Sequence, residues 1–116
     1  MLTENIYYAT EEILQIIKDD FELVNSWSWY ELYKHKKDGS FWRLDKWDKY
    51  QIQYFARIND VDSWQSFDIT HQAIQLLKEF RSVKESQCNW KDCYNKALNN
   101  LAFCEFHAYK EMGMRK

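Results

Sequence analysis

Three cysteines and one histidine in the last third of the chain follow the spacing Cys-x4-Cys-x10-Cys-x2-His. They are Cys88, Cys93, Cys104 and His107, and the chain has no other cysteine. Two close pairs of thiolate and imidazole ligands, joined by a loop long enough to fold back, can enclose one tetrahedral Zn²⁺. The spacing therefore predicts a structural zinc site.

The same segment resembles the small zinc knuckles that recur in bacterial and phage proteins. In those knuckles a Cys-x4-Cys turn precedes an Ala-containing stretch, and a Cys-x2-His pair opens a short helix. The matching residues here are 88–98 and 103–107. The knuckles usually carry Gly before the second and the third Cys, where this chain has Asp92 and Phe103. The resemblance implies a C-terminal knuckle with a short helix near residues 104–112.

Two other interpretations of this segment stay open. Residues 88–112 also fit a helix that buries Tyr94, Leu98, Leu101 and Phe106, because free cysteine is itself among the most buried residue types. A disulfide is the other interpretation, but three cysteines leave one unpaired, and nothing else indicates an oxidising compartment. We therefore expect a cytoplasmic protein.

Aromatic side chains supply much of the material for a core. Six Trp, eight Tyr and seven Phe make up 18% of the 116 residues, so the core must be largely aromatic. A chain of this length supports one hydrophobic core. We expect a single domain, 1–116, with an α+β core over 1–83 and a zinc-knuckle subregion over 84–116. No apolar run approaches the roughly 20 residues that a membrane helix needs, so no membrane partner is expected.

Hydrophobic spacing predicts an α+β fold in which helices cover a small three-stranded antiparallel meander. Helical spacing of apolar residues over 6–18 predicts a first helix, which starts near residue 4 or near residue 10, where Thr10 can cap it. A second helix, from Asp68 or Thr70 to about Val83, is expected to cover the buried face of the sheet.

Strands are predicted over residues 28–35, 40–46 and 50–58, where aromatic and β-branched residues are dense. Asp38-Gly39 supplies the positive φ that a tight hairpin needs between the first two. Alternation along the strands predicts that Trp42 and Leu44 face the covering helix, and that the opposite face of the sheet is largely in contact with water.

The first hairpin, residues 29–44, combines a Trp-x-x-Leu-Tyr strand, an Asp-Gly turn and an aromatic-Trp-x-Leu strand. This pattern resembles bacterial immunity proteins that neutralise polymorphic or contact-dependent toxins, in particular the immunity protein 27 family. Arg43 stands where that family prefers an acid. The resemblance implies an immunity or antitoxin protein that acts as a toxin inhibitor by protein–protein binding.

The chain has more tryptophan than the core of so small a domain is expected to bury. Five of these residues precede position 65: Trp27, Trp29, Trp42, Trp47 and Trp64. Exposed tryptophan anchors protein interfaces, and neighbouring acids attract a basic partner and favour it over other partners. The predicted partner-binding surface therefore consists of six residues: Asp45, Trp47, Asp48, Asp60, Asp62 and Trp64. The expected partner is a cognate protein toxin, and a basic nuclease toxin fits these acids.

Catalysis is not expected. The chain has three histidines and lacks a Gly-rich phosphate loop, a Gly-x-Ser-x-Gly elbow and a His-Glu-x-x-His motif. Four protein ligands also close a zinc site, whereas a catalytic zinc needs an open position.

Nucleic-acid binding is the alternative function. Residues 1–22 carry a net charge of −5 and residues 84–116 a net charge of +2, but no stretch has the dense Lys/Arg patch that nucleic-acid affinity generally requires. In this alternative the chain is a phage or plasmid accessory protein whose knuckle contacts phosphates. The bases that would make these contacts are Lys91, Lys96, Lys110, Arg115 and Lys116.

Overall fold

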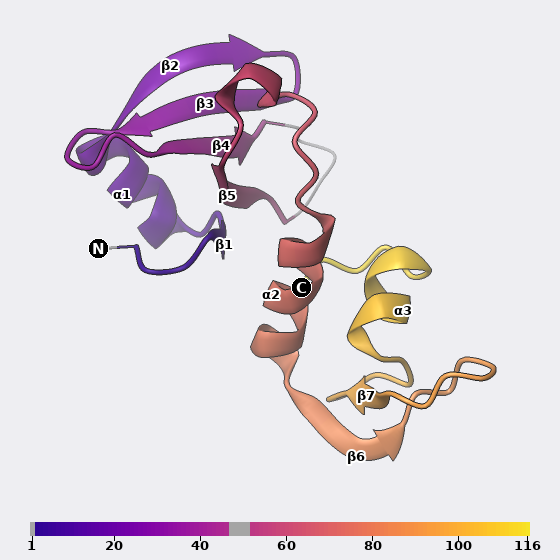
Figure 1. Ribbon diagram of the computed structural model, residues 1–116. Helices are drawn as coiled ribbons and strands as arrows, with labels where there is room; N and C mark the ends of the chain where they lie inside the picture. Colours follow the sequence, from indigo (N-terminus) through magenta and orange to yellow (C-terminus); the bar gives the residue numbers. More distant parts are fainter. Residues whose placement is uncertain (1, 47–51) are drawn as a thin grey trace. The chain divides into compact units, whose positions relative to one another are not determined.

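The computed structural model describes residues 2–46 and 52–116, and the chain divides into two compact units, 1–69 and 70–116 (Figure 1). Both α and β elements are present, as predicted. The structure groups residues 70–83 with the C-terminal segment, whereas the sequence analysis placed them in the α+β core. Among the described residues, no helix is long and apolar enough to cross a membrane.

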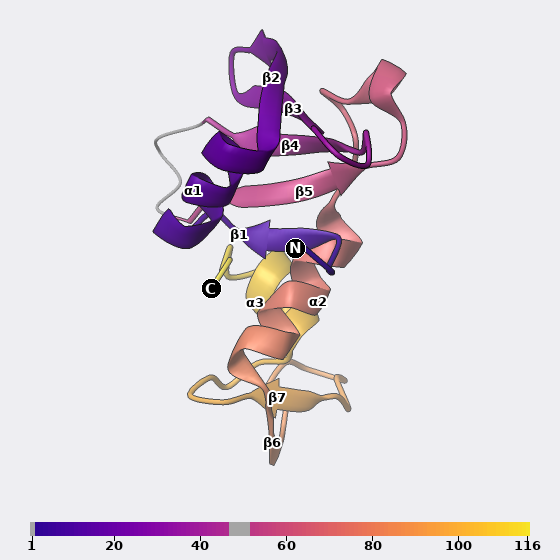
Figure 2. The ribbon, with the colours of Figure 1, turned by 90° about the vertical axis from the view of Figure 1, so that its left-hand side faces the viewer.

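The N-terminal unit contains a five-stranded antiparallel sheet with the strand order β1-β5-β4-β3-β2 (Figure 2). Its strands are β1 (Ile6–Tyr8), β2 (Phe21–Trp27), β3 (Tyr30–His35), β4 (Phe41–Asp45) and β5 (Tyr54–Ile58). The predicted meander corresponds to β3, β4 and β5. The prediction of three strands was wrong, because β1 pairs with β5 and β2 pairs with β3 at the two edges.

The first helix, α1, spans Glu11–Asp20 and begins at the later of the two predicted positions. Thr10 is its N-cap, and the Thr10 hydroxyl accepts a hydrogen bond from the backbone N–H of Ile13. Residues 6–8 have helical spacing but form β1. Long-range pairing of Ile6 with Ala56 therefore overrides the local pattern.

One face of the sheet packs against α1. Ile13 and Ile17 of the helix join Trp42, Leu44 and Phe55 of the sheet in one buried cluster. The predicted burial of Trp42 and Leu44 is confirmed. The predicted cover was wrong, because the helix in the buried cluster with these residues is α1.

The opposite face of the sheet is also covered, so the prediction of a largely wet face was wrong. Leu32 and Ile58 pack there against Trp64, which follows the short 3-10 helix η1 (Val61–Ser63). Phe67 lies against the same cluster. The segment after β5 thus closes the side of the sheet that α1 leaves open.

Arg43 lies on this second face and is only 4% exposed. Its Nη1 donates hydrogen bonds of 3.0 Å each to the backbone carbonyls of Trp64 and Phe67. The guanidinium also stacks over the Tyr30 ring, 4.1 Å from its centroid. Burial lowers the pKa of Arg43, although the nearby acids Asp45 and Asp68 oppose the shift. A charged side chain is tolerated here because backbone oxygens and an aromatic face replace its water.

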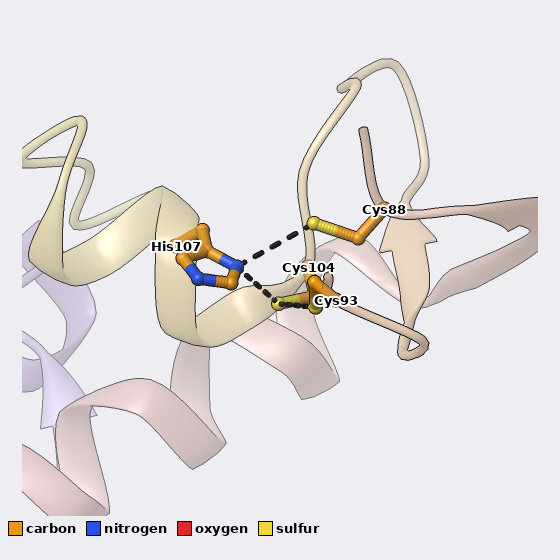
Figure 3. Close-up of side chains that lie close together, drawn as sticks. All are labelled: Cys88, Cys93, Cys104 and His107. Atoms are coloured by element: carbon orange, nitrogen blue, oxygen red, sulfur yellow. Dashed lines mark hydrogen bonds between the residues drawn. The ribbon is translucent and has the colours of Figure 1, made fainter. Parts of the chain in front are cut away.

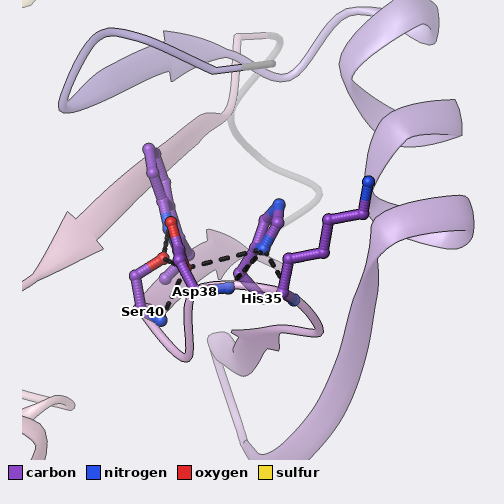
Figure 4. A network of polar contacts seen from close by, with 5 residues as sticks. His35, Asp38 and Ser40 are labelled. Carbon is purple, nitrogen blue, oxygen red and sulfur yellow. Dashed lines mark hydrogen bonds and ion pairs between the residues drawn. The ribbon is translucent and has the colours of Figure 1, made fainter.

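The turn between β3 and β4 is closed by a polar network (Figure 4). Gly39 has φ +74°, the left-handed conformation that the Asp-Gly pair predicted. Asp38 accepts hydrogen bonds from both the backbone N–H and the hydroxyl of Ser40, at 2.8 and 2.6 Å. The Ser40 hydroxyl in turn accepts from Trp42 Nε1. These bonds fix the hairpin that carries Trp42 into the core.

The C-terminal unit pairs two helices with a short hairpin (Figure 1). Its elements are α2 (Thr70–Arg81), β6 (Val83–Gln87), β7 (Lys96–Leu98) and α3 (Glu105–Lys110). Helix α2 confirms the second predicted helix. Leu77 of α2 packs with Leu98 of β7 and Ala108 of α3, and this cluster is the apolar core of the unit.

Candidate metal centre

The elements of the C-terminal unit position the four predicted zinc ligands. Cys88 directly follows β6, and Cys93 lies in the loop between β6 and β7. Cys104 is the N-cap residue of α3, and His107 lies in the first turn of that helix. The backbone of Cys88 donates to Asn95 O at 2.7 Å, which closes the hairpin at the point where the loop begins.

The loop between the first two cysteines explains one departure from the knuckle pattern. Asp92, which stands where knuckles usually have Gly, has φ +60°. Aspartate is one of the few residues with a side chain that adopts this left-handed conformation readily. Cys93 N donates to Trp90 O at 3.1 Å, and Gln87 Nε2 donates to Cys93 O at 2.7 Å. The turn therefore forms without glycine.

The four side chains converge on one point. Figure 3 shows the His107 ring directed toward the sulfurs of Cys88 and Cys104. The His107 Nδ1 lies 3.5 Å from Cys88 Sγ and 3.3 Å from Cys104 Sγ, and the Sγ atoms of Cys93 and Cys104 are 3.8 Å apart. All four candidate ligand atoms lie within 4.8 Å of one another.

Three of the separations are close to the edge lengths of a tetrahedral zinc site. Zn–S bonds of about 2.3 Å and Zn–N bonds of about 2.0 Å in a tetrahedron place the ligand atoms roughly 3.5 to 3.8 Å apart. The observed separations of 3.3, 3.5 and 3.8 Å lie close to these edge lengths. A sulfur pair 3.8 Å apart is far from the roughly 2.05 Å of a disulfide, and all three cysteines are free thiols.

The pKa values of two thiols in the cluster shift in opposite directions. Burial disfavours the Cys88 thiolate, but hydrogen bonds from the backbone N–H groups of Trp90 and Cys104 and from His107 outweigh it and lower the pKa of this thiol to about 7. At Cys93 a hydrogen bond from the backbone of Asn95 favours the thiolate, but burial and the neighbouring thiols prevail and raise its pKa. Crowded thiolates repel one another, and a bound divalent cation removes that repulsion.

The groups around the ligands shield the cluster from water. The three cysteines are at most 8% exposed, and Phe103 packs against them. The Trp90 ring stacks on the His107 imidazole with a centroid distance of 4.8 Å and an interplanar angle of 14°. Asn95 Nδ2 lies 3.9 Å from Cys104 Sγ as a donor to the sulfur. Such outer contacts hold metal ligands in place.

The two other interpretations of this segment were wrong. A helix over 88–112 is not formed, because α3 covers Glu105–Lys110 alone within it. Tyr94 is 83% exposed and Phe106 is 43% exposed, so neither is part of a buried helical face. The short final helix that the knuckle resemblance implied near 104–112 is confirmed.

The structure describes four of the six predicted partner-binding residues. Asp45 is 5% exposed and accepts a hydrogen bond from the backbone N–H of Tyr54, and Trp64 is 6% exposed in the sheet core. Asp60 and Asp62 are exposed, and Asp60 caps η1. Trp47 and Asp48 lie outside the described residues.

Burial divides the tryptophans that the sequence grouped together. Trp42 and Trp64 are buried, whereas Trp27 and Trp29 remain 38% and 45% exposed. The surplus of tryptophan is evident from the sequence, but Trp27 and Trp29 are not among the six residues of the predicted partner-binding surface. Their place before and inside the tight turn between β2 and β3 is the signal that could have identified them.

The bases of the alternative nucleic-acid interface are partly engaged within the unit. Lys96 Nζ lies 3.6 Å from a carboxylate oxygen of Glu85. Lys116 Nζ lies over the Phe80 ring, 5.0 Å from its centroid. Lys91 and Lys110 are exposed.

Comparison with known protein families, curated proteins and solved structures finds no match to this chain.

Proposed function

We propose that Cys88, Cys93, Cys104 and His107 bind one Zn²⁺ as a structural site. The observation that supports the proposal is the convergence of four soft or borderline ligand atoms within 4.8 Å in a shielded position. Three thiolates and one imidazole select zinc over the hard cations calcium and magnesium, which prefer oxygen ligands. Since all four positions are filled by protein, the site stabilises the fold and leaves no place for a substrate.

Metal analysis tests this proposal. Protein produced without a metal-binding tag and purified under reducing conditions should contain about one zinc per chain. Replacement of the metal by Co²⁺ should give the visible absorption bands of a tetrahedral cobalt–thiolate centre. Protein that is folded in residues 70–116 but contains no metal would contradict the proposal.

We further propose that the protein is an immunity-type binding protein that neutralises a cognate bacterial toxin in the cytoplasm. The support is the hairpin of residues 29–44, which resembles the immunity protein 27 family, together with two exposed aromatic side chains, Trp29 within this hairpin and Trp27 just before it. Exposed tryptophan is enriched at the centres of protein interfaces. The proposal includes no catalytic step, because binding alone can occlude the active site of a toxin.

The test is co-expression with the secreted-toxin domain encoded by an adjacent gene. Cells that express the toxin domain should grow when this chain is present, and the two purified proteins should form a stoichiometric complex. The affinity should fall little between about 50 and 200 mM salt, whereas a phosphate-dependent complex loses orders of magnitude over that range. Failure to protect, combined with a strongly salt-dependent complex with single-stranded or duplex DNA, would replace this proposal by the nucleic-acid alternative.

A further inference from the structure

The two edge strands of the N-terminal sheet, β1 and β2, differ in length. Strand β1 has three residues, whereas β2 has seven. Among the described residues no strand pairs with the outer side of β2. All residues from 22 to 29 are exposed, and four of them are large and apolar: Leu23, Val24, Trp27 and Trp29.

Edges of this kind are normally protected. Natural sheets place lysine or proline on long edge strands, or cover them, because an open edge recruits strands from other chains. Residues 19–29 contain three acids, Asp19, Asp20 and Glu22, and neither a base nor a proline. The register shifts between Leu23 and Asn25, and this irregularity is the single deviation from regular pairing with β3. The edge is therefore long and apolar, and Glu22 is the one charged residue of β2 itself.

Ring contacts connect the two exposed tryptophans, Trp27 and Trp29, to the buried Arg43. The buried Arg43 guanidinium stacks on Tyr30, and the Tyr30 ring stacks on Trp27 with centroids 6.0 Å apart. Trp27 meets Trp29 edge to face, with centroids 5.1 Å apart. Because each ring rests on the next, the exposed pair is anchored to the core. Rigid aromatic side chains lose little entropy when a partner binds, which makes them effective interface anchors.

We propose that the outer edge of β2, with Trp27 and Trp29 at its end, is the docking site for an extended basic and apolar segment of a partner protein. The segment adds a sixth strand to the sheet through its backbone and packs its side chains on the exposed apolar residues. This inference rests on the proposed function and assigns the place where the toxin binds.

Charge decides between a foreign segment and a second copy of this chain. Residues 1–69 contain 13 acidic and 8 basic side chains, a net charge of −5. A second copy would bring the same excess of acid to the interface, whereas a basic segment complements it. A foreign basic segment is therefore the occupant that fits.

The experiment titrates the ¹⁵N-labelled, metal-loaded full chain with a capped eight-residue peptide of alternating lysine and valine. Amide signals of residues 22–29 should shift, and the peptide should bind at least about tenfold more tightly than a matched peptide of alternating glutamate and valine. L23K should weaken binding about tenfold or more, because it places a repelling charge on the edge. L14K is the matched control, since Leu14 is a similarly exposed leucine on α1, and it should leave binding unchanged.

Several outcomes overturn the inference. One is the absence of binding, and another is equal binding of the two peptides. Shifts confined to residues 84–116 contradict it as well. Concentration-dependent dimers that L23K dissociates would assign the edge to a second copy. If L23K abolishes peptide binding but toxin neutralisation persists, the toxin binds elsewhere while the proposed immunity function stands. Loss of toxin neutralisation in L23K but not in L14K supports both the docking site on β2 and the proposed immunity function.

Discussion

The two units of this chain are stabilised by different means. Residues 1–69 bury two apolar clusters, one on each face of a five-stranded sheet. Residues 70–116 have one apolar cluster around Leu77, Leu98 and Ala108, and a second buried cluster made of the three cysteines. The units also differ in charge, because the second contains 8 basic and 5 acidic side chains, a net charge of +3.

The C-terminal unit is small and has little apolar surface to bury. Below about 70 residues a single hydrophobic core rarely supplies more than about 3–5 kcal/mol, and natural small domains commonly add a structural metal or disulfides. In the C-terminal unit one of the two buried clusters consists of cysteines, whereas the buried clusters of the N-terminal unit consist of large apolar side chains. A metal that binds them would therefore supply folding free energy to the C-terminal unit alone.

Metal removal should have the largest effect. Chelation under reducing conditions should unfold residues 70–116, because structural zinc sites contribute about 10–16 kcal/mol of apparent binding free energy near pH 7. The sheet of the N-terminal unit should persist. NMR spectra of the labelled full chain would show this as collapsed amide dispersion for the C-terminal residues alone. Retained dispersion of the Leu98 and Ala108 amides after complete metal removal would show that the C-terminal unit folds without a metal.

Substitution of one ligand should reproduce that effect. H107N removes the imidazole whose Nδ1 lies 3.3 Å from Cys104 Sγ and should unfold the same segment. H71N is the matched control, because His71 is exposed on α2 and lies outside the ligand cluster. Equal metal content in the two variants would show that His107 is not a ligand.

Truncation of the sheet core should have the converse effect. Phe55 of β5 is fully buried in the cluster that joins α1 to the sheet, and F55A should destabilise the N-terminal unit by about 3–5 kcal/mol through lost burial and the cavity that remains. The metal content of the C-terminal unit should stay at its wild-type value. Urea denaturation followed by circular dichroism, with parallel metal analysis, tests this. Metal loss caused by F55A alone would show that the units do not fold independently.

Removal of the buried arginine should have an intermediate effect. R43A deletes hydrogen bonds to the carbonyls of Trp64 and Phe67 and should cost about 2–3 kcal/mol, because those carbonyls stay buried. R57A is the control, since Arg57 is exposed on the neighbouring strand β5. Denaturant midpoints of the two variants measure the difference. A loss in R43A no larger than that in R57A would show that the second face of the sheet needs no charged anchor.

The sequence was informative wherever the interacting residues are close along the chain. The cysteine and histidine spacing predicted the ligand cluster, and Asp38-Gly39 predicted the hairpin with its left-handed Gly39. Thr10 likewise predicted one of the two starts considered for α1. In each case the ligand spacing, the turn conformation or the helix cap depends on a few residues that are close in the sequence.

The sequence misled wherever distant residues decide the structure. Ile6 has helical spacing with Ile13, but it pairs with Ala56 in the sheet. Arg43 looked like a solvated strand residue, because its burial depends on carbonyls more than twenty residues away. The hairpin of β6 and β7 was not predicted, since the sequence Val83–Gln87 is polar and its side chains remain largely exposed. Local pattern alone could not supply these partners.

The smallest expected effect concerns the turn between β3 and β4. Hydrogen bonds from the Ser40 hydroxyl and backbone lower the pKa of Asp38 below its usual 3.8. A lowered carboxyl pKa stabilises the fold at neutral pH, and this contribution is lost as the pH falls through the native pKa. S40A removes the stronger of these bonds and should raise the Asp38 pKa toward 3.8, which an NMR titration of its side-chain carboxyl carbon can measure.

The same titration of Asp38 also tests whether the metal stabilises the N-terminal unit. The bonds that lower the pKa of Asp38 all lie within the hairpin of the N-terminal sheet, between residues 38 and 40. Metal removal should therefore leave the Asp38 pKa unchanged even though the C-terminal unit unfolds. A pKa that rises on chelation as far as it rises in S40A would mean that the metal also holds the hairpin, and the division into a sheet unit stabilised by aromatic packing and a second unit stabilised by a metal would fail.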